Sequence, residues 1–330
     1  MATAIGTNVV TSIARHYILP EIVDNIYGRN LMFFRLNQAN KKIVRGGTQI
    51  EVPLMYDTFA AGGFYSGFEE LTIAPSDTVK NGAWDWKQAM VPVAVDGLTL
   101  IKTDSPEAIA DFIRLYFDQA EMEMSRILGT AIWNDGSTPN TKAPDSIPMA
   151  VDDGTVTATY GGITRSANTW WKLKYDGSTT TLTLSALQTL FGQCSVGGQH
   201  PTVGVTTQTN YNRFWVLGQG SSTATYPKGP AAVDEQLMQA GFTNLVFNGV
   251  PICVDDGVPT NGPTGAGSGH HFYFLNESYA WLAVSPRADF VMEDFQTPLT
   301  QDAMVAKLFW AGNLIFNNCR TSGKLTALTA

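Results

Sequence analysis

Two extended arms and the stretch between them decide the fold that this sequence predicts. The arms are Thr48-Gln-Ile-Glu-Val-Pro-Leu-Met55 and Trp84-Asp-Trp-Lys-Gln-Ala-Met-Val-Pro-Val-Ala-Val95, and they flank a Gly- and aromatic-rich tip, Phe59-Ala-Ala-Gly-Gly-Phe-Tyr-Ser-Gly-Phe68. A two-stranded ribbon alone is marginally stable in water, and exposed apolar patches usually bind something. We therefore expect the ribbon to be buried on a neighbouring copy of the same chain. The residues expected at that contact are Phe59, Phe64, Tyr65, Phe68, Trp84 and Trp86.

The alternative for this ribbon is a hairpin that folds back over its own core. Gly62-Gly63 and Gly67 argue against it, because glycine permits an extended, bendable loop. We expect the ribbon to bend at Gly46, Gly47 and Gly97.

A long amphipathic helix follows the ribbon. Asp104 or Ser105 is the expected N-cap, Pro106 suits the first turn, and Glu107 meets the positive end of the helix dipole. Asn134-Asp135-Gly136 ends the helix, which at 1.5 Å per residue is roughly 40 Å long. We expect it to be the mechanical spine of its domain. Apolar residues recur along it at helical spacing, at Ile109, Phe112, Ile113, Tyr116, Phe117, Ala120, Met124, Ile127, Leu128, Ala131 and Ile132.

The remaining sequence predicts an α+β fold without an internal repeat. Residues 1–45 are interpreted as an arm with short helical pieces that lies across a neighbour. Asn248-Gly249 is a hairpin signal within a strand pair. Helices are expected at 182–194 and 210–217, and strands at 201–207, 242–254, 272–275, 280–284, 290–292 and 304–319.

Composition excludes several classes of protein. Only 15% of the 330 residues are charged, against about 25% in typical soluble domains, and a net charge of −8 disfavours an electrostatic nucleic-acid binder. The three cysteines Cys194, Cys253 and Cys319 lack metal or disulfide spacing and suit buried positions in a reducing cytosol. The sequence shows neither a secretory signal nor a run of about 20 apolar residues that would span a membrane.

Enzymatic signatures are missing from the sequence. It has no Gly-x-Ser-x-Gly, no phosphate-binding loop and no dinucleotide fingerprint. His270 and His271 would point to opposite faces of a strand, which is poor geometry for one metal. Asp152-Asp153 and Asp255-Asp256 precede glycine and are better explained as turns. We predict no catalytic, cofactor-binding or metal-binding residue.

The order of these parts resembles the major capsid protein of tailed bacteriophages, whose fold is shared with herpesviruses. Four phrases carry the resemblance: Gly161-Gly-Ile-Thr-Arg-Ser166 with Trp170-Trp171, Ser185 to Leu190 leading into Val203-Gly-Val-Thr206, Phe242 to Asp255, and Trp310 to Asn318. Their order and spacing along nearly the whole chain matter more than any single phrase.

The resemblance implies a shell-forming protein that assembles into hexamers and pentamers of an icosahedral capsid around double-stranded DNA. It implies an N-terminal arm (1–45), an extended loop (46–103), a peripheral domain with the spine helix (104–183), an axial domain (184–300) and a return segment to the peripheral domain (301–330). Location in the virion, after assembly in the host cytoplasm, follows from it.

The implied partners are many copies of the chain, a portal protein and a separate scaffolding protein, with decoration proteins as further candidates and DNA contacted only non-specifically. Maturation of the shell would use the bends named above. A covalent bond between subunits is a further hypothesis, from Lys80 or Lys87 to Asn313 or Asn317.

Two other classes of function stay open at this point. Eight tryptophans and many glycine turns would also suit a β-rich hydrolase or carbohydrate-binding module, which needs a cleft with convergent polar groups. Another virion component, such as a tail-tube or decoration protein, is disfavoured by the long helix.

Overall fold

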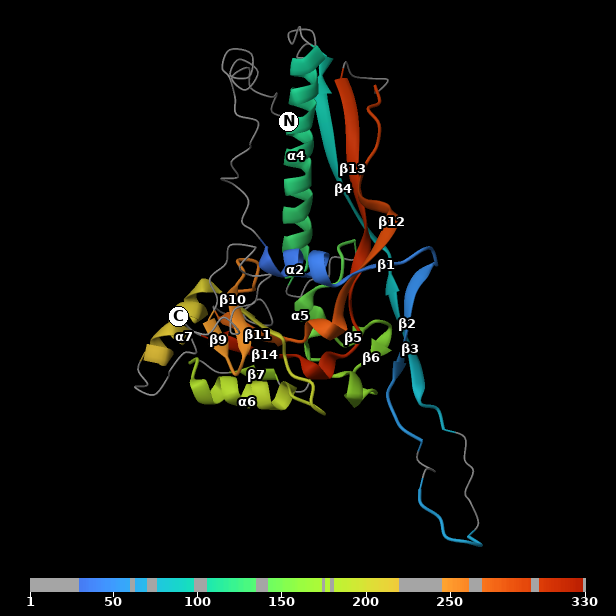
Figure 1. The fold of residues 1–330 in the computed structure, drawn as a ribbon, viewed down its shortest axis with the longest axis vertical. Coiled ribbons are helices and arrows are strands. Elements are labelled where there is room, and N and C mark those ends of the chain that lie inside the picture. The colour runs from blue at the N-terminus through green and yellow to red at the C-terminus, as the bar shows by residue number, and fades with distance from the viewer. Residues whose placement is uncertain are drawn as a thin grey trace.

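The computed structural model describes residues 30–59, 63–69, 76–97, 106–134, 142–173, 176–178, 181–219, 245–260, 269–297 and 303–328. An elongated region built on one long helix and one sheet stands beside a second unit built on a larger sheet (Figure 1). A two-stranded ribbon projects away from both (Figure 1). The mixture of helices and strands confirms the predicted α+β class.

The long helix is α4, Pro106–Ala131. It begins at the predicted proline, and its 26 residues give a length of about 39 Å. Ala120, Met124 and Leu128 are buried at the predicted helical spacing, whereas Asp118 and Glu121 are exposed. The two expected N-cap residues lie outside the described residues.

A four-stranded sheet lies along α4 in the order β1-β12-β13-β4. β4 is antiparallel to β13 along all 10 of its residues. Val91, Val93 and Val95 alternate with exposed residues on β4, so that the valines face the core. The strands are β1 (Lys41–Ile43), β12 (Ala280–Met292), β13 (Ala303–Phe316) and β4 (Lys87–Asp96).

The larger sheet has six strands in the order β7-β14-β11-β8-β10-β9. Its two faces enter different cores, because neighbouring residues of β11 point in opposite directions. Tyr273 and Leu275 join the core that contains α4, whereas Phe272 and Phe274 pack with the residues of α6 and α7. The strands are β7 (Asp176–Ser178), β14 (Gly323–Leu328), β11 (His270–Leu275), β8 (Val203–Thr206), β10 (Val250–Val254) and β9 (Leu245–Phe247).

Short elements complete the described chain. The predicted hairpin turn between β9 and β10 is confirmed, with Asn248 and Gly249 at positive φ. The predicted helix before Cys194 and the helix after Thr207 are also confirmed as α6 and α7. The remaining elements are α2 (Leu31–Ala39), α5 (Ile147–Ala150), α6 (Leu184–Cys194), α7 (Gln208–Gln219), β5 (Thr159–Tyr160), β6 (Ile163–Thr164), η1 (Thr169–Trp171), η3 (Glu277–Tyr279) and η4 (Cys319–Thr321).

The strands of the ribbon pair differently from the two arms that the sequence predicted. β2 (Gln49–Met55) is antiparallel to β3 (Val79–Asp85), with Ile50 opposite Trp84. The stretch from Trp84 to Val95 is therefore not one arm, because the chain leaves the ribbon after Asp85 and continues as β4. The long β13 is a better partner for β4 than the seven residues of β2.

The structure also differs from the predicted N-terminal arm and from the predicted domains of the C-terminal part. Within the predicted arm, α2 packs into the core of its own chain, with Leu31, Met32 and Leu36 fully buried. Residues 1–29 lie outside the described residues. The C-terminal segment divides between the two sheets, because β13 joins the four-stranded sheet and β14 joins the six-stranded one. β12, expected in the axial domain, belongs to the four-stranded sheet.

A buried ionic cluster connects the six-stranded sheet to the segment after α5. The Lys324 ammonium on β14 donates to Asp152 Oδ1 at 2.9 Å, and Arg165 Nη1 lies 3.7 Å from Asp152 Oδ2. Arg165 also donates to the carbonyl oxygens of Thr157 and Ala150. Asp152 and Arg165 are completely buried. Sequence reasoning anticipated only the turn, which exists because Asp152 Oδ2 accepts the Gly154 amide.

None of the helices in the described part of the chain combines the length and the apolarity that a bilayer crossing requires.

Candidate assembly interface

The ribbon tip is the most exposed apolar part of the described chain. Phe64 and Phe68 are fully exposed, and Phe59 and Tyr65 keep 73% and 68% of their surface accessible. Met55 and Val79, where β2 ends and β3 begins, extend this apolar surface toward the body. Contiguous exposure of this kind is rare on a monomer and indicates a protein-binding surface. Four of the six predicted contact residues are therefore free to contact a partner.

The other two predicted contact residues are placed differently, and for Trp84 the prediction is wrong. Trp84 is only 2% exposed, because its ring packs beneath Gly161 and edge-on to Tyr160 at 5.8 Å. Trp86 is partly buried against the same core, and its Nε1 donates to the Gly47 carbonyl at 3.0 Å. Both tryptophans hold the ribbon base to its own subunit.

Gly161 leaves room for the Trp84 ring. A Cβ at Gly161 would lie 2.6 Å from Trp84 Cζ2, and the residue has φ +56. Gly162 also has positive φ, but a Cβ there would meet nothing closer than Ala83 at 3.9 Å. Substitution of Gly161 therefore combines backbone strain with crowding, whereas substitution of Gly162 causes backbone strain alone.

We expect Gly161→Ala to lower the free energy of unfolding by about 2–4 kcal/mol, as the sum of left-handed backbone strain and overpacking. Gly162→Ala is the matched control and is expected to cost about 1 kcal/mol from strain alone. Denaturant unfolding of the two variants measures the difference. Equal losses would mean that Trp84 is not confined by Gly161.

The three predicted hinge glycines do not have equivalent positions. Gly46 and Gly47 have φ of +74° and +98° in an exposed segment before β2. Gly97 follows β4, and β4 is paired with β13 up to Asp96. Gly97 is therefore separated from the ribbon by a strand that belongs to the body.

Two of the four residues named for a covalent crosslink, Lys80 and Asn313, already have side-chain partners within the chain. Lys80 Nζ donates to Asn168 Oδ1 at 2.9 Å. Asn313 is fully buried, where its Nδ2 donates to the Asp85 carbonyl at 3.0 Å and its Oδ1 accepts the amides of Asp145 and Leu314. Asn313 is thus a structural residue at the ribbon base, out of reach of a neighbour's lysine.

Asp145 lies at this same junction and has an unusual ionisation. Burial raises its pKa to about 6, the nearby Asp85 acts in the same direction, and Lys87 and the hydrogen bond with Asn313 oppose the shift. A carboxyl whose pKa is higher in the folded state than the unfolded value of about 3.9 binds its proton more tightly when folded. The folded state therefore gains stability as pH falls from above 6 toward 4.

We expect Asp145→Asn to raise the free energy of unfolding at pH 8 by about 1–3 kcal/mol, because the neutral amide removes the cost of a buried carboxylate. The gain should shrink as the wild-type carboxyl takes up its proton on acidification below pH 6. Unfolding at pH 8 and pH 5 measures both effects, with the exposed Asp118→Asn as control. A loss of stability at pH 8 would contradict this account.

Further exposed apolar residues were missed by sequence reasoning. Met90 on β4 and Val291 on β12 both stand opposite Phe309 of β13, so that they form one row across the outer face of the four-stranded sheet. Trp215 and Val216 are exposed on α7. The alternation along β4 could have predicted the exposure of Met90, because Met90 lies on the face of the strand opposite to the buried valines.

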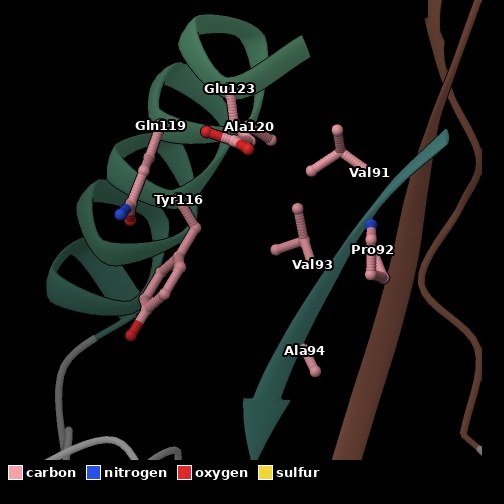
Figure 2. A pocket seen from close by; sticks show the side chains of 8 residues that line it. All are labelled: Val91, Pro92, Val93, Ala94, Tyr116, Gln119, Ala120 and Glu123. Carbon is pink, nitrogen blue, oxygen red and sulfur yellow. The ribbon is translucent and has the colours of Figure 1, made fainter. Parts of the chain in front are cut away.

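A groove of about 270 Å³ lies between α4 and β4. Figure 2 shows aliphatic side chains of β4 on one side and α4 residues on the other. Of the titratable lining residues, Glu123 is paired with Arg126 at 2.6 Å, and burial raises the pKa of Tyr116. This lining brings together no nucleophile and base. The full lining is Val91, Pro92, Val93, Ala94, Tyr116, Gln119, Ala120 and Glu123.

Residues with metal-binding or nucleophilic chemistry are dispersed. His270 Nδ1 faces the Thr207 hydroxyl, whereas His271 Nδ1 faces the Tyr273 hydroxyl. The described residues contain no group of three or more potential metal ligands. The three cysteines are buried, as predicted, and burial raises the pKa of Cys194 to about 12 and that of Cys319 to about 11. Burial therefore favours the protonated thiols of Cys194 and Cys319, which are poor nucleophiles.

Comparison with solved structures defines the class of fold. The capsid protein of cyanophage A-1(L) matches with a TM-score of 0.70 at 15% identity, covering 98% of this chain and 100% of that chain. The capsid of Myoviridae phage XM1 matches at 0.54 and 11% identity over 99% and 100% of the two chains. The SrpI encapsulin from Synechococcus elongatus PCC 7942 matches at 0.57 and 10% identity over 99% and 97%.

No protein-family model matches the sequence, and no curated protein matches it. The structural likeness nevertheless extends over nearly the whole chain in each case. The chain has the phage capsid-protein fold, and the predicted fold is confirmed.

Proposed function

We propose that this chain is a major capsid protein, which self-assembles into hexamers and pentamers of a closed icosahedral shell around double-stranded DNA. One observation carries the proposal: a chain with the capsid-protein fold extends an aromatic ribbon tip that its own core leaves uncovered. The tip would pack on the next subunit. Contacts of this head-to-tail kind are heterologous and close into rings when the rotation between subunits closes.

Each structural region has a role in this proposal. The ribbon is the overlapping element, and α4 with the four-stranded sheet forms the peripheral domain. The six-stranded sheet with α6 and α7 forms the axial domain around the five-fold and pseudo-six-fold axes. Residues 1–45 remain the proposed arm, apart from α2, which packs in the chain's own core.

The partners follow from a shell of this kind. We assign many copies of the chain as the main partner, with a portal protein and a separate scaffolding protein during assembly in the host cytoplasm. Packaged DNA would be contacted only non-specifically, because the chain has a net charge of −8. Decoration proteins remain further candidate partners, and analysis of purified particles would reveal them as well as any covalent link between subunits.

A non-enzymatic role fits the described side chains. A hydrolase or a carbohydrate-binding module needs a cleft with convergent polar groups. The groove between α4 and β4 is lined mainly by aliphatic side chains instead (Figure 2).

A protein compartment is the second candidate function, because one structural neighbour is an encapsulin. Both functions use a closed shell and differ in what the shell encloses. Purified particles containing double-stranded DNA would favour the virion, and particles containing a protein cargo would favour the compartment.

The first experiment is negative-stain electron microscopy of the purified chain, with light scattering on the same sample. Rings, shells or other closed particles are the expected result. A stable monomer at every protein and salt concentration would overturn the proposal.

A further inference from the structure

We propose that the ribbon is divided into a base clamped to its own subunit and a free tip, with the bends at residues 57–58 and 76–77 and not at Gly46-Gly47. The purpose of such a bend rests on the proposed function, whereas the clamp is a property of a single chain. The clamp is formed by β2 and β3 against residues 160–170.

Hydrogen bonds fix one side of the clamp. The Ala83 amide donates to the Gly161 carbonyl at 2.9 Å, so that β3 is connected to the turn between β5 and β6. Three residues further out, Lys80 Nζ donates to Asn168 Oδ1 at 2.9 Å. Two positions along β3 are therefore attached to the same segment of the body.

Ring packing fixes both strands. The Trp84 ring is buried beneath Gly161 and beside Tyr160. Beyond the end of β2, the Tyr56 ring stacks on Trp170 with centroids 5.4 Å apart and planes at 20°. Trp170 itself packs against the main core. The ribbon is thus held from its root at Trp84 out to Tyr56.

The contacts to the body stop where strand pairing stops. The Tyr56 amide donates to the Thr78 carbonyl at 3.0 Å, just beyond the last pair, Met55 and Val79. In the described tip beyond it, the hydrogen bonds are local, from the Thr58 amide to Asp57 and from the Ser66 amide to Glu69. The change from clamped to free occurs within these few residues.

A swing at Gly46-Gly47 would have to break the clamp. The Gly47 carbonyl already accepts a hydrogen bond from Trp86 Nε1. The positive φ of both glycines explains their identity without a hinge, because the left-handed conformation favours glycine. A substitution by proline there cannot test hinging, since proline cannot adopt positive φ.

The arrangement has a consequence for assembly. The tip can change direction beyond Tyr56 while Trp84 and the core beneath it stay in place. One chain can then reach neighbours at slightly different angles, as the rings of a closed shell require, without repacking its interior.

Hydrogen exchange of the unassembled subunit, read by mass spectrometry, tests the clamp independently of shell formation. In the wild type, β3 amides from Val79 to Asp85 should exchange as slowly as those of β4, and amides of residues 63–69 should exchange fast. Asn168→Ala and Trp170→Ala should speed exchange in β3 by about tenfold while β4 and β13 stay unchanged. Thr58→Ala, beyond the clamp, is the control and should leave β3 unchanged.

Two results would overturn the inference. One is wild-type β3 exchanging as fast as the tip, and the other is unchanged β3 exchange in both variants. Asn168 is only partly buried, so its variant stays informative even if Trp170→Ala disturbs the fold. Because the measurement uses single subunits, a protein that fails to form shells can still have the clamp, and a shell-forming protein can lack it.

Discussion

Asp152→Ala is expected to lower the free energy of unfolding by about 3–5 kcal/mol, because it leaves buried cations without their counter-charge. Lys324 is only 4% exposed, and its ammonium lies 2.9 Å from Asp152 Oδ1. The substitution also removes the acceptor of the Gly154 and Thr157 amides. The ionic cluster connects β14 to the segment after α5, so this loss loosens the six-stranded sheet from that segment.

The neighbouring carboxylate provides a matched control. Asp153 accepts the Thr155 amide at 2.8 Å but lies at the surface of the turn, so Asp153→Ala should cost no more than about 1 kcal/mol. A double-mutant cycle with Lys324→Met isolates the coupling between Lys324 and Asp152. Similar losses for Asp152→Ala and Asp153→Ala would contradict the role assigned to the cluster.

The pH dependence of this cluster has the opposite sign to that of Asp145. Burial tends to raise the pKa of Asp152, but the Lys324 ammonium and the hydrogen bonds from Thr157 and Gly154 outweigh it, so the net shift is downward. A lowered pKa contributes stability above the unfolded value of about 3.9, and that stability is lost as pH falls through the folded pKa. Asp152→Ala should therefore flatten the acid limb of the stability curve below about pH 4.

The second large effect is expected at the ribbon tip. Replacing Phe64 and Phe68 together by Ser should raise the protein concentration needed for assembly at least about 100-fold, because each phenylalanine contributes about 1.5–3 kcal/mol when it is buried at a contact. Both rings are fully exposed in the single chain, so its stability should not change. Light scattering across a concentration series, together with denaturant unfolding, measures the two quantities.

Replacing the same two residues by Leu is the control, because leucine keeps an apolar side chain of similar burial energy. Assembly near wild-type concentrations is expected for the Leu variant. If the Ser variant assembles as readily as the wild type, the tip does not form the contact between subunits.

Local patterns were sufficient for much of the fold. The spacing of Ala120, Met124 and Leu128 predicted α4, and Asn248-Gly249 predicted the turn between β9 and β10. The order of the parts predicted the capsid-protein fold. The helix and the turn depend on residues close together in sequence, which a local pattern can reveal, whereas the fold was inferred from a resemblance along nearly the whole chain.

The errors concern contacts between residues far apart in sequence. Trp84 looked like part of an exposed arm because its partner, Gly161, lies 77 positions later in the chain. Similarly, β4 was joined to the ribbon because nothing local shows that β13 pairs with it. Asp152 followed by glycine predicted a turn, but its cation Lys324 comes from the last strand. Only the assembled fold brings these pairs together.

The central claim is that the ribbon tip is covered by another copy of the chain. Electron cryomicroscopy of the assembled particles, at a resolution that shows side chains, tests it most directly. The account predicts that Phe64 and Phe68 of every subunit are buried against the next subunit, while Trp84 stays beneath Gly161 of its own chain. Particles in which the tip is exposed to solvent, or folded back on its own subunit, would contradict it.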